Sequence, residues 1–459
     1  MTDAPVPGSF RDPSGFVFRR DGVVLRQVNA SYADDYDLLL SSGLYDALTD
    51  AGLLLPHAEL DVADAPEPGA HRLLRPEQLG FVSHPYEWCF SQLKAAALAT
   101  LRIQSVALDH GMSLRDASAY NIQFRGTAPV LIDTLSFEAL PDGEPWVAYR
   151  QFCQHFLAPL ALESLVDVRL GQLLRIHLDG VPLDLASRLL PAGTRLRPSL
   201  SLHLHAHAKS QRRHAGDATG RAGGGRFSLQ AFRGLIDSLS GAVGKLTWNP
   251  QPSEWVDYYA AGQSYGEDAA EHKRELVAKL LGELSPAVVW DFGANTGRFS
   301  RVAAETGALV VALEMDPSSV EASWREAVAA GEERILPLVL DLSNPSPALG
   351  WAHAERQSLA DRGPADVVLA LALVHHLAIA NNVPLERIAD HFADLGRWLL
   401  IEFVPKADPM VQRLLASRQD VFPGYTEEGF EAAFADRFNI DRRERLRGSE
   451  RTLYLLRRR

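Results

Sequence analysis

The C-terminal half of the chain alternates short apolar runs rich in β-branched residues with segments of helical periodicity. Predicted strands lie at residues 288–292, 309–314, 335–340, 366–373 and 398–404, with predicted helices between them that end near residues 307, 330 and 395. Such alternation is typical of a doubly wound parallel sheet with helices on both faces. Two further strand-like runs, 438–446 and 452–457, would close the sheet as a hairpin. The sequence therefore predicts an α/β fold with a seven-stranded Rossmann-like sheet over residues 245–459.

The remaining residues predict a different architecture. A chain of 459 residues should hold two or three domains. Residues 1–160 mix α and β patterns: a hairpin at 16–25, a long helix at 90–108, and short strands at 122–124 and 130–132. The Pro/Gly-rich run 63–76 predicts a loop, and few strands are expected before residue 79. Residues 161–244 then predict a helical connector that contains a basic, glycine-rich flexible linker at about 207–227.

Composition restricts the classes of partner. Lys and Arg number 46 against 58 Asp and Glu, a formal net charge of -12, which disfavours binding to a phosphate backbone. Two cysteines, Cys89 and Cys153, cannot form a disulfide framework or a four-cysteine zinc site. The chain has no apolar window of about 18 residues and no signal-peptide pattern at its start. We therefore expect a cytoplasmic protein with no membrane span and no nucleic-acid partner.

Three acidic residues follow successive predicted strands, at the edge where open α/β sheets bind small ligands. Asp291 ends the first strand and opens the turn D-x-G-x-N-x-G, whose Gly293 and Gly297 let the backbone approach a ligand closely. Glu314 ends the next strand, where a carboxylate can accept hydrogen bonds from two ribose hydroxyls. Asp341 follows the third strand, where it could accept from an exocyclic amine. Because an acid at the turn would repel a pyrophosphate, the pattern favours a cationic nucleoside-like ligand.

These features resemble the class I S-adenosylmethionine-dependent methyltransferases over residues 245–459. The segments that carry the resemblance are DFGANTG, VVALEMD, LVLDL and ADVVLALALVHHL, in that order. The resemblance implies that S-adenosylmethionine is the cofactor. It also implies a set of cofactor-binding residues, with the methionine moiety at the glycine turn, ribose at the second acid and adenine at the third: Asp291, Gly293, Asn295, Gly297, Glu314 and Asp341. Tyr265, in a possible lid segment 255–265, completes the predicted cofactor site, with aromatic packing as the equal alternative.

The sequence restricts the catalytic group and the methyl acceptor less than it restricts the cofactor. His375 and His376 follow the fourth strand at the mouth of the predicted site, where either could be a base or a substrate anchor, and a structural histidine is the alternative. Methyl transfer needs no metal. Both cysteines lie outside this domain, which excludes covalent attack on a pyrimidine through a domain cysteine. The sequence Ala370-Leu371-Ala372-Leu373 stands where planar-amide methyltransferases carry Asn/Asp-Pro-Pro-aromatic. The classes of methyl acceptor that are left are oxygen, ordinary nitrogen or carbon atoms of small molecules or saccharides.

The N-terminal region carries a second resemblance, over residues 16–160. An Arg-Asp pair ending at Asp116, then Asn121, then Asp133 after a strand resemble the catalytic core of protein-kinase-like phosphotransferases. The resemblance implies Asp116 as a base, and Asn121 and Asp133 as magnesium ligands for Mg-ATP. No lysine precedes Lys94, however, so only an arginine such as Arg26 could replace the usual phosphate-binding lysine.

Three hypotheses follow from these two resemblances. The leading one is a methyltransferase with a kinase-like module that binds substrate or regulates. The second is a bifunctional kinase and methyltransferase that acts on one acceptor, and the third is a non-catalytic, cofactor-sensing scaffold. A separate histidine cluster, His203, His205 and His207, could bind zinc on one face, although solvated or core histidines are favoured. Oligomeric state is not predicted.

Overall fold

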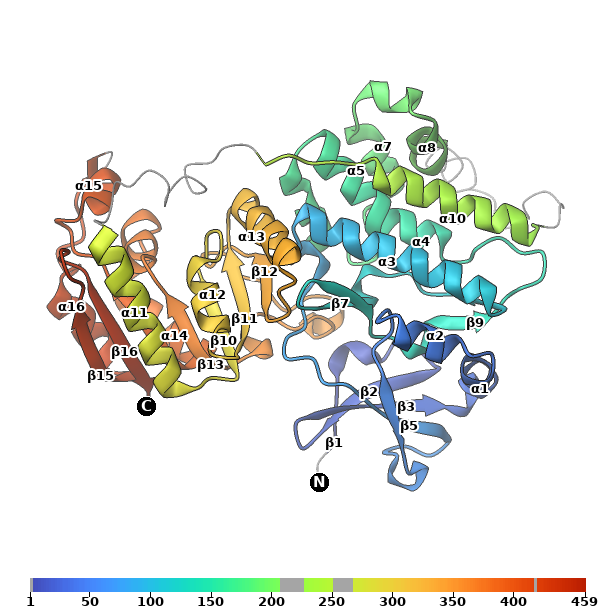
Figure 1. The fold of residues 1–459 in the computed structure, drawn as a ribbon, viewed down its shortest axis with the longest axis horizontal. Helices are drawn as coiled ribbons and strands as arrows, with labels where there is room; N and C mark the ends of the chain where they lie inside the picture. Colours follow the sequence, from blue (N-terminus) through green and yellow to red (C-terminus); the bar gives the residue numbers. More distant parts are fainter. Residues whose placement is uncertain (1–2, 207–226, 251–266, 417–418) are drawn as a thin grey trace. The chain divides into compact units, whose positions relative to one another are not determined.

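The structure, a computed structural model, describes residues 3–206, 227–250, 267–416 and 419–459. The described chain divides into two compact units (Figure 1). The first comprises Met1–Asn249 together with the short segment Gly350–Arg356, and the second comprises Pro250–Leu349 and Gln357–Arg459. The mixed α/β composition predicted from the sequence is confirmed. The predicted linker at 207–227 lies almost wholly outside the described residues.

An antiparallel five-stranded sheet begins the first unit, in the order β1-β2-β3-β5-β4. Its strands are β1 (Asp3–Pro5), β2 (Gly15–Arg20), β3 (Val23–Asn29), β4 (His57–Leu60) and β5 (Ala70–Pro76). Asp21 and Gly22 both have positive φ and form the predicted hairpin turn between β2 and β3. The prediction of a loop over 63–76 was wrong for residues 70–76, because β5 begins directly after Gly69 and buries Leu73 and Leu74. The expectation of few N-terminal strands was wrong for the same reason.

A long helix and two small strand pairs follow this sheet. The predicted helix is α3 (Phe90–Asp109), and the strand pairs are β6 (Met112–Leu114) with β9 (Phe137–Ala139) and β7 (Ile122–Arg125) with β8 (Ala128–Leu131). Helices α1 (Ala33–Ser41) and α2 (Leu44–Asp50) precede them. The other α-helices among the described residues of this unit are α4 (Tyr149–Phe152), α5 (Ala158–Leu165), α6 (Leu173–Ile176), α7 (Leu183–Leu189), α8 (Pro198–Leu200) and α10 (Leu229–Gly244). Residues 161–244 are therefore grouped with the N-terminal region in one unit.

The second unit is built on a seven-stranded sheet in the order β12-β11-β10-β13-β14-β16-β15. The strands are β10 (Val288–Phe292), β11 (Leu309–Glu314), β12 (Ile335–Val339), β13 (Ala365–Ala370), β14 (Gly396–Phe403), β15 (Phe438–Arg445) and β16 (Thr452–Arg458). The first five are parallel, and the β15–β16 hairpin is antiparallel to them. All five parallel strands therefore end at one edge of the sheet, where β10 through β12 place their acids.

Helices cover both faces of this sheet. On one face, α11 (Glu267–Leu284) and α12 (Arg298–Ala304) pack on alternate residues of the strands, among them Val289 and Val310. On the other face, α14 (Leu385–Leu395) places Phe392 against Phe292, and α16 (Glu427–Ala435) places Phe430 against Tyr454. Two more helices, α13 (Pro317–Ala330) and α15 (Pro409–Ala416), complete the unit.

The segment after β13 departs from the prediction. The predicted strand 366–373 ends at Ala370, and Ala372 has a left-handed φ of 51°. The predicted single helix to residue 395 is divided into a π-helix, His376–Ala380, and α14, which begins at Leu385. Residues 381–384 separate the two, because Asn382 has a left-handed φ of 56° and Pro384 cannot donate the backbone hydrogen bond that a continuous helix needs.

Candidate functional site

The turn after β10 is held open by three residues with positive φ, which are Gly293 (69°), Asn295 (51°) and Gly297 (83°). The backbone N–H of Gly293 donates to the carbonyl of Leu313 at 2.8 Å, which joins the turn to the end of β11. The N–H of Asn295 donates to Glu314 Oε2 at 2.9 Å. The predicted glycine turn and the predicted second acid therefore form one hydrogen-bonded unit.

A cavity of about 260 Å³ lies at this edge of the sheet. Five of the predicted site residues line it: Gly293, Asn295, Glu314, Asp341 and His376. The sequence did not single out the other lining residues, most of which are apolar: Phe292, Leu313, Met315, Leu340, Leu342, Ser343, Leu371, Ala372, Leu373, Leu377, Ala380 and Asn381. The cavity thus combines apolar walls with a few polar groups at fixed points, as is common for small-molecule sites.

Two carboxylates of the cavity have no cationic partner among the described residues. Glu314 accepts hydrogen bonds from the backbone N–H groups of Asn295 and Asp316, and burial raises its pKa above the ordinary value. Asp341 accepts from the N–H and the hydroxyl of Ser343, at 2.8 and 2.6 Å. Each carboxylate oxygen can accept more than one hydrogen bond, so both groups can still bind a donor in the cavity.

Three of the predicted residues do not line the cavity. Asp291 is buried and accepts from the Ser300 hydroxyl at 2.6 Å, and burial raises its pKa to about 7. Gly297 caps α12, and a Cβ there would lie 2.7 Å from Ser323 Oγ, so its role in the structure is steric. His375 is fully buried and is not among the lining residues. Tyr265 and the predicted lid segment fall outside the described residues.

The two adjacent histidines are distinguished by their position. His376 lines the cavity, whereas His375 is fully buried and neither ring nitrogen has a hydrogen-bond partner within the described residues. Their rings lie 4.2 Å apart. Burial lowers the pKa of His376 to about 4, with a smaller effect from the charge of Arg451, and burial lowers that of His375 as well. Both rings are therefore neutral at pH 7, and of the two only His376 can meet a ligand in the cavity.

A buried network of four charged residues lies on the same face of the sheet as Asp291. Lys273 of α11 pairs with Glu402 of β14, and Arg451 pairs with Glu402 at 3.4 Å and with Asp408 at 2.6 Å. Burial lowers the pKa of Lys273, which also exerts a charge effect on Asp291 that favours its ionised form. Its four residues come from separate elements, so no local sequence pattern predicted the network.

The predicted N-terminal residues come together in the first unit. Asp133 accepts hydrogen bonds from Arg26, from the Ser136 hydroxyl at 2.8 Å and from the N–H of Leu135 at 3.1 Å. The amide of Asn121 donates to Ser136 Oγ at 3.3 Å, and its side chain also hydrogen-bonds to Asp116. We refer to Arg26, Asp116, Asn121, Asp133 and Ser136 as the N-terminal polar network.

The carboxylates of this network are not suited to bind magnesium. Asp133 forms an ion pair with Arg26, and Asp116 Oδ1 is taken by the N–H of Ser118 and the amide of Gln151. Mg²⁺ needs near-octahedral oxygen ligands at about 2.0–2.1 Å, and the guanidinium that is paired with Asp133 would repel the metal ion at that carboxylate. Within the described ranges, no group of three or more His, Cys, Asp or Glu side chains is arranged to hold a metal ion.

The described members of the histidine cluster bond to hydroxyl groups. His203 is buried between Tyr149 and Ser238, whose hydroxyl oxygens lie 2.8 and 2.9 Å from its ring nitrogens. His205 lies between Ser187 and Thr194, both at 2.8 Å. Because both nitrogens of each ring are already used, neither ring is a free metal ligand. His207 lies outside the described residues.

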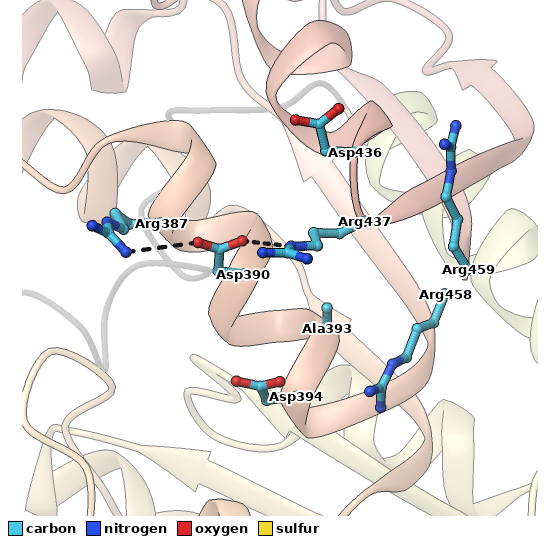
Figure 2. Close-up of a pocket in the computed structure, with 8 residues that line it drawn as sticks. All are labelled: Arg387, Asp390, Ala393, Asp394, Asp436, Arg437, Arg458 and Arg459. Carbon is cyan, nitrogen blue, oxygen red and sulfur yellow. Dashed lines mark hydrogen bonds and ion pairs between the residues drawn. The ribbon is translucent and has the colours of Figure 1, made fainter.

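A second hollow, of about 500 Å³, lies where α14 ends and β16 approaches the C-terminus (Figure 2). Its charged groups pair with one another, as Asp390 does with Arg387 and Arg437. The register places Arg458 beside the first residue of β15 and Arg457 beside Trp398 near the start of β14. This hollow is therefore at the amino edge of the parallel strands, opposite the edge where ligands bind in such sheets. The first cavity is the better candidate.

No helix in the part of the chain that the structure describes has both the length and the apolar character needed to cross a bilayer.

Comparison with known proteins places the chain in a family. No family model matches it. Nodulation protein NoeA of Rhizobium meliloti (strain 1021) is 37% identical over an alignment 465 positions long, which covers 98% of this chain and 95% of that protein. The chain belongs to the NoeA family. This similarity extends over both units, so the NoeA family shares the whole two-unit sequence.

Solved structures give weaker likenesses. Magnesium protoporphyrin IX methyltransferase (ChlM) from Synechocystis PCC 6803 with bound SAH is 22% identical, with a TM-score of 0.31, over 44% of this chain and 94% of that one. WbdD is 15% identical, with a TM-score of 0.32, over 47% of this chain and 46% of that one. At TM-scores this low, neither likeness assigns a function to this NoeA-family chain.

Proposed function

We propose that the second unit is an S-adenosylmethionine-dependent methyltransferase that acts on an oxygen, nitrogen or carbon acceptor of a small molecule or saccharide. The observation that supports it best is the placement of Glu314 and Asp341 around one cavity, next to a backbone turn opened by Gly293 and Asn295. Two carboxylates that have no cationic partner in the part of the chain that the structure describes suit a ligand that carries hydroxyl and amine donors together with positive charge. The order of the strands and the edge at which the acids lie agree with this proposal.

Different residues of the cavity would bind different parts of the cofactor. S-adenosylmethionine, when bound, supplies a methyl group on a positively charged sulfur. Glu314 would accept from the ribose hydroxyls, Asp341 would accept from the adenine amine, and the turn at Gly293 and Asn295 would hold the methionine end. The apolar wall from Leu371 to Leu377 would exclude water, which makes the position and orientation of the two reactants the main contribution to rate.

His376 is the proposed acceptor-facing group. Its neutral ring can accept a hydrogen bond from an acceptor hydroxyl or amine and orient that group toward the methyl donor. With a pKa of about 4, its thermodynamic drive to take a full proton at pH 7 is small. We therefore assign it a role in orienting the acceptor, and His375 a role in packing beneath it.

The cofactor proposal is tested by calorimetric titration of S-adenosylhomocysteine into the full chain. Glu314→Ala removes two charge-assisted acceptors, so we expect binding roughly 10- to 100-fold weaker than wild type. Glu314→Gln keeps the size and one acceptor and should lose less. Glu333→Ala, at an exposed position in the turn before β12, is the matched control and should bind as wild type does. Equal affinity for wild type and Glu314→Ala would refute the proposed cofactor geometry.

The other hypotheses differ in what they predict for turnover. A cofactor-sensing scaffold binds S-adenosylhomocysteine but transfers no labelled methyl to any metabolite in an extract. A bifunctional enzyme is favoured by the assembly of Asp116, Asn121 and Asp133 in the N-terminal polar network, but the same network pairs Asp133 with Arg26. Magnesium-dependent ATP consumption in the presence of an acceptor would support it.

A further inference from the structure

The N-terminal polar network contains its own fixed cation. Arg26 lies in β3 of the five-stranded sheet, and Asp133 follows β8, 107 residues later. The two side chains form an ion pair in which only 17% and 15% of the side-chain surface remains exposed. A guanidinium keeps its charge at any pH that proteins experience, so this cation is permanent.

Both oxygens of the Asp133 carboxylate are engaged. Oδ1 accepts from Arg26 and from the N–H of Leu135, and Oδ2 accepts from the Ser136 hydroxyl, which is itself buried. Burial alone would raise the pKa of Asp133, but the charge of Arg26 and these hydrogen bonds outweigh it and hold the pKa below its ordinary value. The carboxylate is thus ionised and already neutralised by a partner from the same chain.

The second carboxylate is also engaged. Asp116 accepts from the N–H of Ser118 at 2.9 Å and from the Gln151 amide at 2.7 Å, and Asn121 adds a side-chain hydrogen bond. A divalent cation between Asp116 and Asp133 would have to compete with Arg26 for the Asp133 carboxylate. It would also lie within a few ångströms of the guanidinium of Arg26, where like charges repel strongly at a mostly buried site.

We propose that Arg26 takes the position of a divalent cation at Asp133, so that the N-terminal polar network is a metal-free site. Any ligand of this site must then be bound without a bridging metal ion. The inference concerns the first unit and does not depend on methyl transfer by the second.

The proposal is tested by titrating MnCl₂ into the full chain and following free Mn²⁺ by electron paramagnetic resonance. Wild type and Asp133→Asn should bind Mn²⁺ equally. Arg26→Gln removes the fixed charge and leaves Asp133 available, so we expect at least tenfold tighter Mn²⁺ binding than in wild type. The double variant Arg26→Gln/Asp133→Asn should return to the wild-type level. Arg26→Lys keeps the charge and should gain no Mn²⁺ site.

Two results would overturn the proposal. One is a Mn²⁺ site in wild type that Asp133→Asn abolishes, and the other is a folded Arg26→Gln variant with no gain in Mn²⁺ affinity. Folding is checked by circular dichroism and by thermal unfolding, which should remain cooperative in Arg26→Gln. If Arg26→Gln does not fold, ATP titration into wild type with magnesium or with EDTA decides. Equal isotherms support the proposal, and magnesium-dependent binding contradicts it.

Discussion

The two units each gather carboxylates at a polar site, but they neutralise them differently. In the second unit, Glu314 and Asp341 line a cavity and have no cationic partner among the described residues. In the first, Asp133 is bound by Arg26 and Ser136. Similar carboxylates can thus serve opposite purposes, because an unpaired carboxylate beside a cavity can bind a ligand, whereas a paired one mainly holds the fold together.

We expect the largest difference between the two units when the arginine of an ion pair is removed from each. Arg451→Met leaves Asp408 and part of Glu402 unpaired in a buried region, so we expect a loss of about 3–5 kcal/mol in the free energy of unfolding. Arg26→Met should lose less, about 1–2 kcal/mol, because water reaches both members of that pair. Chemical denaturation measures both. Equal losses in the free energy of unfolding would contradict the expectation that partial exposure to water makes the Arg26–Asp133 pair contribute less.

Asp291 should make the second unit less stable as pH rises. Its folded pKa of about 7 lies above the ordinary value of 3.8, so between these values the folded chain holds a proton that the unfolded chain has lost. Stability therefore falls as pH rises from 5 to 8, by about 2–3 kcal/mol from this group. Asp291→Asn should remove that slope in urea titrations at the two pH values. An unchanged slope would mean that Lys273 keeps Asp291 ionised in the folded chain.

Two buried histidines, one in each unit, should make the protein less stable as the pH falls. His155 in the first unit and His376 in the second both have a pKa lowered by burial to about 4, below the ordinary 6.5. The unfolded chain therefore gains protons first as pH falls through 6.5, and each histidine costs about 2 kcal/mol of stability by pH 5. His155→Asn and His376→Asn should each reduce the acid sensitivity, measured as the difference in unfolding free energy between pH 7 and pH 5. If only one does, the other ring is protonated in the folded state.

Two glycine substitutions give the smallest expected effects, with opposite signs. Gly297→Ala introduces a Cβ at a φ of 83° and 2.7 Å from Ser323 Oγ, so we expect a loss of about 1–2 kcal/mol. Gly241→Ala, in the exposed part of α10 with open space around it, should stabilise the first unit by about 0.5–1 kcal/mol. Thermal unfolding compares the two variants directly. Stabilisation by Gly297→Ala would mean that the turn tolerates a right-handed backbone.

Local patterns predicted most of the second unit. The five parallel strands and the hairpin are found within a few residues of their predicted positions, because buried strands and amphipathic helices differ in the period of their apolar residues. The predicted loop at 63–76 failed because β5 buries two consecutive leucines rather than alternate residues. Gly69 directly precedes β5 and Pro76 ends it, so these two residues mark the bounds of a strand.

The face of each side chain was predictable in part. Strand alternation places Asp291 on the same face as Val289, toward α11, and so away from the cavity wall formed by Phe292. Lys273 stands at a core position of α11, four residues before buried Val277, which signals a buried partner but does not name it. Its partner Glu402 is 129 residues away, and the pair of Arg26 and Asp133 spans 107 residues. Only the folded chain shows such pairings.

Because the segment after β13 forms a π-helix, the number of residues in it determines which side chains face the cavity. The N–H of Asn381 bonds to the carbonyl of His376, five residues earlier, so the turn carries one more residue than an α-helical turn would. Removing any one residue from 377 to 380 would rotate everything beyond it by about 100° relative to His376. His376 and Asn381, which both line the cavity, would then no longer face it together. Among relatives, single-residue insertions and deletions in this segment should accordingly be rarer than substitutions.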